Sequence, residues 1–442
     1  MPVKTACFLL LAFLSVQPSL LTQESSRVTL FPKPSEDLIL AVGDVQAAPG
    51  GAGTELATAV ETFNRVLWDD LSFAGFFTIA GRGFYPPAPI VRPETDIDYE
   101  AWNAIPFKVS FLTVGTVSLS RNVLRAEVSV YDMKQRKRAF GKAYTGDPGQ
   151  IRTMAHYWAD EIVYQLTAGT SRGIASSRIA YVARKGNAKE IHTMDYDGHN
   201  SRAFTHGGSL NLFPHWAPDN SKLAFVSYRP KPEITIYSYL DGSRLPFPMF
   251  NTFASSPAIS PDGSEVIFAL RTPRGDPDLF ISRLDGSNRR NITNNPAIDS
   301  SPTWSPSGRQ IAYISGMPGQ IHICDADGSN VRRIVKEGGD ADGVAWSPDG
   351  KWLAFHWKPR RSPNYEIFVV DSTGGTIRQL TSGGGSNEYP TWAPDGRHLA
   401  FQSNRTGSWQ IYTMLLEGSE PRRITHSGNN TSPSWSGYFR RD

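Results

Sequence analysis

The sequence has only two cysteines, almost no excess charge of one sign, and no apolar run beyond its first residues that approaches membrane-spanning length. Cys7 lies inside an N-terminal apolar run, so removal of that run leaves Cys324 alone and excludes an intramolecular disulfide. The net charge of +3, from 45 basic and 42 acidic residues, gives no reason to expect nucleic acid as a partner. Stability therefore has to come from a buried core.

Glycine and proline, in contrast, are abundant. The chain of 442 residues contains 39 glycines and 32 prolines, a composition that favours many short strands joined by tight turns. The length suits two domains, one of which can be large and repetitive.

The N-terminus reads as an export signal. Lys4 supplies a positive start, and Thr5 to Val16 form an apolar run that is too short to span a bilayer. We therefore expect residues 1–23 to be a signal peptide and the mature chain to lie outside the cytoplasm. No small-x-small triplet between Ser15 and Glu24 fixes the cleavage site. Residues 24–36 are expected to form an exposed N-terminal segment.

A seven-residue unit of the form Pro-x-Trp-Ser-Pro-Asp-Gly recurs through the second part of the chain. Its Pro-Asp-Gly portion predicts a tight turn, and the alternating apolar residues that follow predict strands. The spacing of 42 to 46 residues is the length of a four-stranded propeller blade. The residues at the Trp position of the copies are Trp216, Ile259, Trp304, Trp346, Trp392 and Trp435.

The two ends of the repeat are incomplete and complement each other. The half-unit that starts near Arg178 has no Pro-x-Trp strand before it, and the last copy, Pro433 to Gly437, has nothing after it. We predict that residues 171–442 form a six-bladed β-propeller, closed by the C-terminal strand as the inner strand of the first blade. The tryptophans, at one fixed place in the unit, are interpreted as packing between blades rather than as a ligand-stacking platform.

Residues 37–170 lack the repeat and predict a separate α/β domain. Leu38 to Val42 reads as a strand, and Thr54 is a candidate cap for an amphipathic helix that Gly75 ends. Leu124 to Tyr131 alternates like a half-buried strand, and residues 151–166 predict a second amphipathic helix.

Two motifs with catalytic associations lack the context that they need. The G-x-S-x-G match from Gly169 to Gly173 places Ser171 after a helix and before a strand, the reverse of a hydrolase elbow. The glycine-rich loop Gly50 to Gly53 has neither the third glycine of a dinucleotide fingerprint nor the Lys of a P-loop. The sequence therefore predicts no enzyme and no cofactor.

The sequence contains only weak indications of a metal-binding site. The nine histidines, His199 among them, have no cysteine partners and no H-E-x-x-H motif, so no zinc site is expected. Acidic residues before the Pro-x-Trp strands are predicted to gather at one mouth of the propeller channel, either holding a cation or forming solvated loops. They are Asp299, Asp340, Asp342 and Glu388.

The order of these features resembles the TolB family of the Tol-Pal envelope system. The resemblance covers nearly the whole mature chain and is carried by the export signal, by residues 70–76, by Ala101 to Ala104, and by a propeller that opens at Arg178 to Val182. It implies a monomeric periplasmic adaptor that supports outer-membrane integrity and envelope constriction during cell division. Its implied partners are the Pal lipoprotein and TolA, with other outer-membrane proteins left open.

The same resemblance implies two binding regions. Phe253, Ser256 and Ser300 match positions of the Pal-binding channel mouth, although Phe253 stands where such proteins can carry His. Ser26, Arg27, Val28, Thr29 and Leu30 match the segment that engages TolA, and the alternative for them is a frayed terminus. The alternative function is an exported propeller that binds a small ligand or glycan at its channel mouth.

Overall fold

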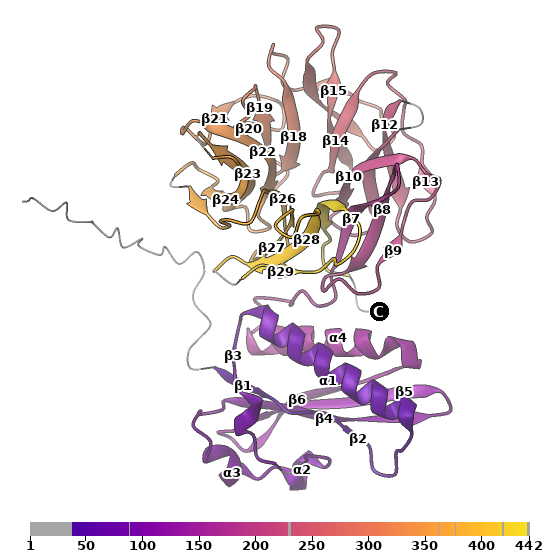
Figure 1. Ribbon diagram of the computed structural model, residues 1–442, viewed down its shortest axis with the longest axis vertical. Coiled ribbons are helices and arrows are strands. Elements are labelled where there is room, and N and C mark those ends of the chain that lie inside the picture. The colour runs from indigo at the N-terminus through magenta and orange to yellow at the C-terminus, as the bar shows by residue number, and fades with distance from the viewer. Residues whose placement is uncertain are drawn as a thin grey trace, which may run out of the picture.

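The computed structural model describes residues 38–439, except 88, 229–230, 361, 376 and 418–419. Figure 1 shows two parts, a sheet with helices and a set of sheets arranged around a central space. The predicted signal peptide and the TolA-binding segment, Ser26 to Leu30, lie outside the described residues. No helix in the described part of the chain is long and apolar enough to cross a membrane.

The first part is a mixed sheet with helices on both faces (Figure 1). Its strands run in the order β3-β1-β4-β5-β6, with β2 beside β4. The strands are β1 (Ile39–Val42), β2 (Gln46–Ala47), β3 (Thr78–Ile79), β4 (Phe111–Ser120), β5 (Val123–Asp132) and β6 (Lys137–Gly146). The helices are α1 (Thr54–Ala74), α2 (Pro93–Asp96), α3 (Tyr99–Asn103) and α4 (Ile151–Leu166), with short 3-10 turns at Arg82–Phe84 and Pro148–Gln150.

The alternation of side-chain direction along the strands determines which residues of this sheet face each layer of helices. Leu124, Ala126, Val128 and Val130 of β5 share a buried cluster with α1 and α4, as the predicted period of two requires. The opposite face packs against Trp102 of α3. The predicted cap was wrong, because Gly53 occupies the N-cap of α1 with no side-chain bond and Thr54 is already helical. Gly75 does end the helix, in the left-handed conformation at φ 68°.

The second part consists of five sheets, four of them antiparallel with four strands each. These four are β14 (Ala254–Ile259), β15 (Glu265–Arg271), β16 (Pro277–Arg283) and β17 (Arg290–Asn291); β18 (Asp299–Trp304), β19 (Gln310–Ser315), β20 (Gln320–Asp325) and β21 (Arg332–Arg333); β22 (Gly339–Trp346), β23 (Trp352–Pro359), β24 (Glu366–Asp371) and β25 (Arg378–Gln379); and β26 (Asn387–Trp392), β27 (His398–Ser403), β28 (Gln410–Leu415) and β29 (Arg422–Arg423).

The fifth sheet contains both ends of the repeat region. The last strand, β30, pairs antiparallel with β7, and a single parallel pair, Leu210 with Lys189, joins β10 to β8. Its members are β7 (Arg178–Lys185), β8 (Ala188–Asp195), β9 (Arg202–Ala203), β10 (Leu210–Trp216), β11 (Lys222–Tyr228), β12 (Pro232–Ser238), β13 (Arg244–Leu245) and β30 (Asn430–Trp435).

The strands that carry the Pro-x-Trp unit form a ring. In the order β10, β14, β18, β22, β26 and β30, each contacts the next, and β30 contacts β10. Hydrogen bonds cross between neighbouring inner strands. The backbone N–H of Trp216 donates to Ser434 Oγ at 3.3 Å, and the backbone N–H of Trp435 donates to Thr391 Oγ1 at 3.1 Å. We call these six strands the inner strands.

The residues at the Trp position are buried. Trp304 donates its indole N–H to the carbonyl of Ala258 in the preceding sheet at 3.1 Å, and Trp392 donates to Ala345 in the same way. The aromatic side chains therefore fill the space between sheets, and the indole N–H groups of Trp304 and Trp392 bond across it.

The two parts of the chain meet at one end of the ring, in a region that we call the junction. His398 Nε2 lies 2.8 Å from the Phe73 carbonyl, and Arg397 donates to the Gly75 carbonyl at 3.0 Å. These bonds satisfy carbonyls at the C-terminus of α1 that have no partner within the helix. The β26–β27 turn and the turn after β8 lie here, so the junction is opposite the end at which the inner strands begin.

We expect loss of the β30 contacts to destabilise the protein strongly. Trp435 is buried and donates its indole N–H to Ser177 Oγ at 2.8 Å, so Trp435→Ala leaves a cavity and an unpaired hydroxyl. The expected loss in free energy of unfolding is about 3 kcal/mol, and truncation before Pro433 should cost more. Denaturant unfolding measures both, with Val331→Ala, at a 55% exposed side chain, as the control. Unchanged melting of the truncated chain would contradict the importance of the β30–β7 pairing.

Acid should weaken the contact between β23 and β26. His356 is buried, and its Nδ1 accepts the Tyr389 N–H at 3.2 Å, which requires that nitrogen to be unprotonated. Burial lowers the pKa of His356 to about 4, against the opposing pull of Asp342 and Asp340. Because the folded pKa is below the unfolded value, this stability is complete above about pH 6.5 and declines toward pH 4.

The measurement is the free energy of unfolding at pH 6.5 and pH 5. The wild-type chain should lose up to about 2 kcal/mol more than His356→Asn, whose amide oxygen can still accept the bond without titrating. An identical pH dependence in the two chains would show that His356 is not the titrating group.

Candidate docking site

Every inner strand contains a β-bulge at the same place. Two residues of the inner strand stand opposite one residue of the second strand, for example Ser256 and Pro257 opposite Phe268. The first bulge residue has a positive φ between 50° and 59° in each case, a conformation that residues other than glycine seldom adopt. These residues are Phe213, Ser256, Ser301, Gly343, Tyr389 and Ser432.

A buried aromatic ring faces each bulge. The residues opposite the six bulges are Phe225, Phe268, Tyr313, Phe355, Phe401 and Tyr181, and all are at most 4% exposed. Backbone held in a sparsely populated conformation is concentrated at binding and catalytic sites, so we take the bulges as the starting point for a candidate site.

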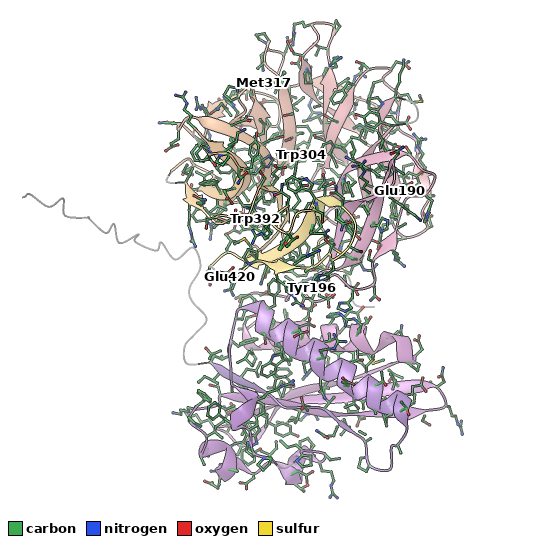
Figure 2. The ribbon with its side chains drawn as sticks, viewed as in Figure 1. Glu190, Tyr196, Trp304, Met317, Trp392 and Glu420 are labelled. Atoms are coloured by element: carbon green, nitrogen blue, oxygen red, sulfur yellow. The ribbon has the colours of Figure 1, made fainter. Side chains whose placement is uncertain are left out.

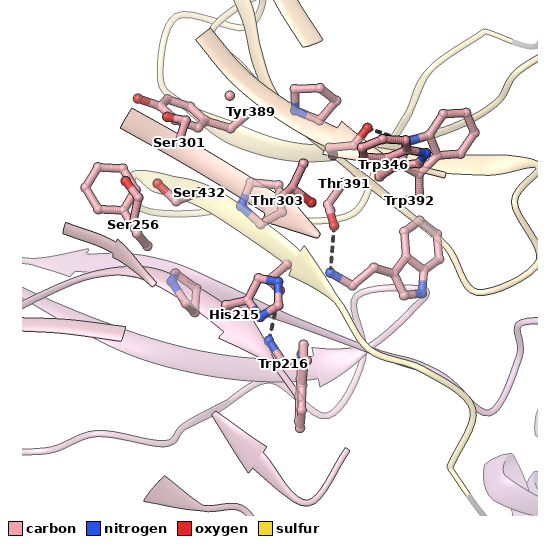
Figure 3. Close-up of a pocket in the computed structure, with 18 of the residues that line it drawn as sticks. His215, Trp216, Ser256, Ser301, Thr303, Trp346, Tyr389, Thr391, Trp392 and Ser432 are labelled. Carbon is pink, nitrogen blue, oxygen red and sulfur yellow. Dashed lines mark hydrogen bonds between the residues drawn. The ribbon is translucent and has the colours of Figure 1, made fainter. Parts of the chain in front are cut away.

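The bulge residues line the channel between the inner strands. The channel encloses about 280 Å³, and all six bulge residues contribute to its wall. Figure 3 shows Ser256, Ser301, Ser432 and Tyr389 around the same space, so hydroxyl groups from separate strands converge there. The rings of Phe213 and Tyr389 lie 6.0 Å apart although their strands are not neighbours, and this pair narrows the channel.

Exposed apolar side chains lie at the end of the ring where the inner strands begin, whereas the channel cavity is lined by the bulge residues and by residues that follow them toward the junction. Leu210 begins β10, Phe253 directly precedes β14, and Met317 lies in the β19–β20 turn, beside the start of β18. Their exposed fractions are 38%, 37% and 82%, and Figure 2 shows Met317 at the periphery, far from the junction. The Arg271 guanidinium stands 6.0 Å from the Phe253 ring. We call this end of the ring the mouth.

The three residues that family resemblance assigns to Pal binding take different positions along the inner strands. Phe253 is at the edge of the mouth and Ser256 is a bulge residue of the channel wall. Ser300 pairs with Ile314 in the β18–β19 hairpin, and its neighbour Ser301 takes the bulge position instead. The signal for Ser301 is present in the sequence, because five of the six bulge residues directly precede a proline of the repeat.

The candidate cation ligands do not converge. Asp342 accepts bonds from Ser301 Oγ and the Gly343 N–H, Asp340 accepts one from the Tyr365 hydroxyl, and Glu388 accepts one from Gln402. Asp299 is fully buried and accepts a bond from Asn295. Burial raises the pKa of Asp299 and of Glu388. Among the described residues, no three of these carboxylates bring ligand atoms together.

Ser171 and the glycine-rich loop have the contexts that the sequence predicts. Ser171 lies in the turn after α4, and its Oγ accepts the Gly173 N–H at 3.2 Å. Gly50 to Gly53 connect β2 to α1.

Known proteins share this architecture. A family model described as "TolB beta propeller domain" matches residues 164–358 and 339–439. Tol-Pal system protein TolB of Anaeromyxobacter dehalogenans strain 2CP-1 is 31% identical over 310 residues, 69% of this chain and 68% of that protein. Protein TolB homolog of Chlorobium chlorochromatii is 29% identical over 275 residues, which are 60% of this chain but only 58% of that relative.

The crystal structure of TolB from Acinetobacter baumannii matches with a TM-score of 0.75, covering 91% of this chain and 97% of that one at 23% identity. This match confirms the β-propeller fold with a helix-containing N-terminal region. The relatives are named as Tol-Pal system components, and their names indicate no enzymatic family. The chain belongs to the TolB family.

Proposed function

We propose that this protein is a periplasmic adaptor of the Tol-Pal system and that it binds the Pal lipoprotein at the mouth. The observation that carries the proposal is the position of the mouth. The first part of the chain occupies the opposite end, at the junction, and leaves the mouth open to a partner. Exposed apolar side chains grouped at one end of a domain are what protein interfaces use as anchors.

The propeller would act as a rigid platform. We infer six blades between residues 171 and 442, in which β30, β7, β8 and β9 form the blade that contains both ends of the repeat. Each blade presents its bulge residue to the channel, so a partner meets a preformed surface and little entropy is lost on docking. The other proposed units are the signal peptide 1–23, the segment 24–36 and the α/β domain 37–170.

The N-terminal segment is the proposed contact for TolA. Ser26 to Leu30 alternate in character, and such a segment can add a strand to the exposed sheet edge of a partner. A monomer that holds Pal at the mouth and TolA through this segment would connect outer-membrane and inner-membrane components. This connection is the proposed basis for outer-membrane integrity and for constriction during cell division.

A small-ligand role for the channel is the second candidate. Hydroxyl groups of Ser256, Ser301, Ser432 and Tyr389 line a cavity of about 280 Å³, and such groups suit hydrogen bonding to a sugar. The two candidates make different predictions for side chains at the rim of the mouth, because a ligand inside the channel does not reach them.

We expect Phe253→Ala to weaken Pal binding by about 10-fold, because it removes an exposed aromatic anchor. The measurement is isothermal titration of the mature chain with the periplasmic domain of Pal from the same organism. The matched control is Leu240→Ala, an 86% exposed apolar side chain in the β12–β13 turn at the junction end of the ring. Equal effects of the two substitutions, or no binding by the wild-type chain, would contradict docking at the mouth. Binding of glycans without Pal binding would favour the second candidate.

A further inference from the structure

A cavity with basic side chains opens at the mouth, between the sheet β18–β21 and the sheet β22–β25. It encloses about 510 Å³ and shares no lining residue with the channel. The strand ends that form it all lie at the mouth end of their sheets. We call this cavity the basic notch, and its polar lining includes Gln320, Arg333, Asp340, Lys358, Arg360 and Ser362.

Elsewhere at the mouth end, a repeated polar network links an outer strand to the next inner strand. Glu366, at the start of β24, accepts a bond from the Thr381 hydroxyl at 2.6 Å and one from the Asn387 amide of β26 at 2.7 Å. The same network of three side chains is formed by Glu190, Thr205 and Asn211 and by Gln410, Thr425 and Asn430.

The basic notch lies at a place where this network is missing. Gln320 begins β20, in the position of the first residue of the network, but the positions of the threonine and the asparagine are taken by Val335 and Ala341. Both are apolar and buried. The Gln320 amide donates instead to the Gly339 carbonyl at 2.9 Å. Departures from a protein's own pattern are expected at functional sites.

Two cations of the basic notch have no anionic partner within the protein. In the part of the chain that the structure describes, no carboxylate oxygen lies within 4.0 Å of the Lys358 ammonium or the Arg360 guanidinium. Lys358 Nζ lies 4.9 Å from the centre of the Tyr365 ring. Gly338 gives Arg360 room, because a Cβ at Gly338 would stand only 2.8 Å from Arg360 Nε.

The one carboxylate of the basic notch is already bonded at both oxygens. Asp340 accepts the Gly319 N–H at 2.8 Å and the Tyr365 hydroxyl at 2.5 Å. The third cation, Arg333, donates to the Val335 carbonyl at 2.6 Å, which leaves its charge unneutralised. Three cations therefore face one occupied carboxylate, and the basic notch favours an anionic group.

An exposed apolar side chain adjoins the basic notch. Met317 is 82% exposed and directly precedes Pro318, which lines the cavity (Figure 2). A free inorganic anion would contact only the charged groups, whereas a protein segment with an acidic and an apolar side chain would contact both. Guanidinium groups bind carboxylates through paired hydrogen bonds, and exposed methionine adapts to the surface of a partner.

From this juxtaposition we propose that the basic notch receives an aspartate or glutamate side chain of the protein that docks at the mouth. Arg360 and Lys358 bind the carboxylate, and Met317 makes the adjoining apolar contact. The inference rests on the proposed docking of Pal, and it adds the charge that the partner must carry at this point.

The test is isothermal titration of the mature chain with the periplasmic domain of Pal from the same organism, at low and at high sodium chloride. Arg360→Glu should weaken binding about 10-fold at low salt, because it reverses a charge that faces the partner. Lys358→Gln, the second variant, should weaken it about 3-fold. Both differences should shrink at high salt, which screens exposed charges.

The matched control is Arg309→Glu, which makes the same charge change at an exposed arginine of the β18–β19 turn, at the junction end of the ring. Wild-type affinity in both Arg360→Glu and Lys358→Gln, or an equal loss in the control, would overturn the acidic contact and leave docking of Pal standing. No binding of Pal by the wild-type chain would overturn both. Sodium phosphate is the probe for a free anion, and saturable phosphate binding that Pal does not displace would also overturn the proposal.

Discussion

The pairing of β30 with β7 joins segments that are far apart in the sequence, and the positions of the other sheets depend on it. The Arg178 N–H donates to Ser436 Oγ, 258 residues further along the chain. Through this contact β30 takes its place between β26 and β10, and the inner strands complete their ring. The ring then fixes the positions of the channel and the junction, because the bulges that line the channel and the turns that receive α1 belong to the same strands.

The repeat predicted the strands well because each unit contains its own turn and its own alternating pattern. The Trp position could also be interpreted from sequence, since one large apolar residue per unit at constant spacing is what packing between sheets requires. Single positions within a strand are harder to place from sequence. A bulge shifts the residues that follow it relative to the partner strand, so simple alternation does not reveal that Ser301 lines the channel.

The junction could not be predicted, because its chemistry is tertiary. Asp70, His156 and Asp197 come from three segments, each of which has an ordinary local pattern. Asp70 does not interrupt the helical spacing of apolar residues in α1, and Asp197 belongs to an Asp-Gly turn like others in the repeat. Only the packing of α1 and α4 against the turn after β8 buries these charges beside one another. The start of α1 was also not predicted correctly, because the local preference of Thr54 for the N-cap position did not determine where the helix begins.

The distance in sequence between β7 and β30 has a consequence for biogenesis. Arg178 and Ser436, which are bonded where the two strands meet, are 258 residues apart, so β7 is synthesised long before β30 and offers an unpaired edge to any neighbouring chain until β30 follows. A nascent molecule is therefore vulnerable to misassembly during that interval, when a chaperone that shields β-strand edges would be most valuable.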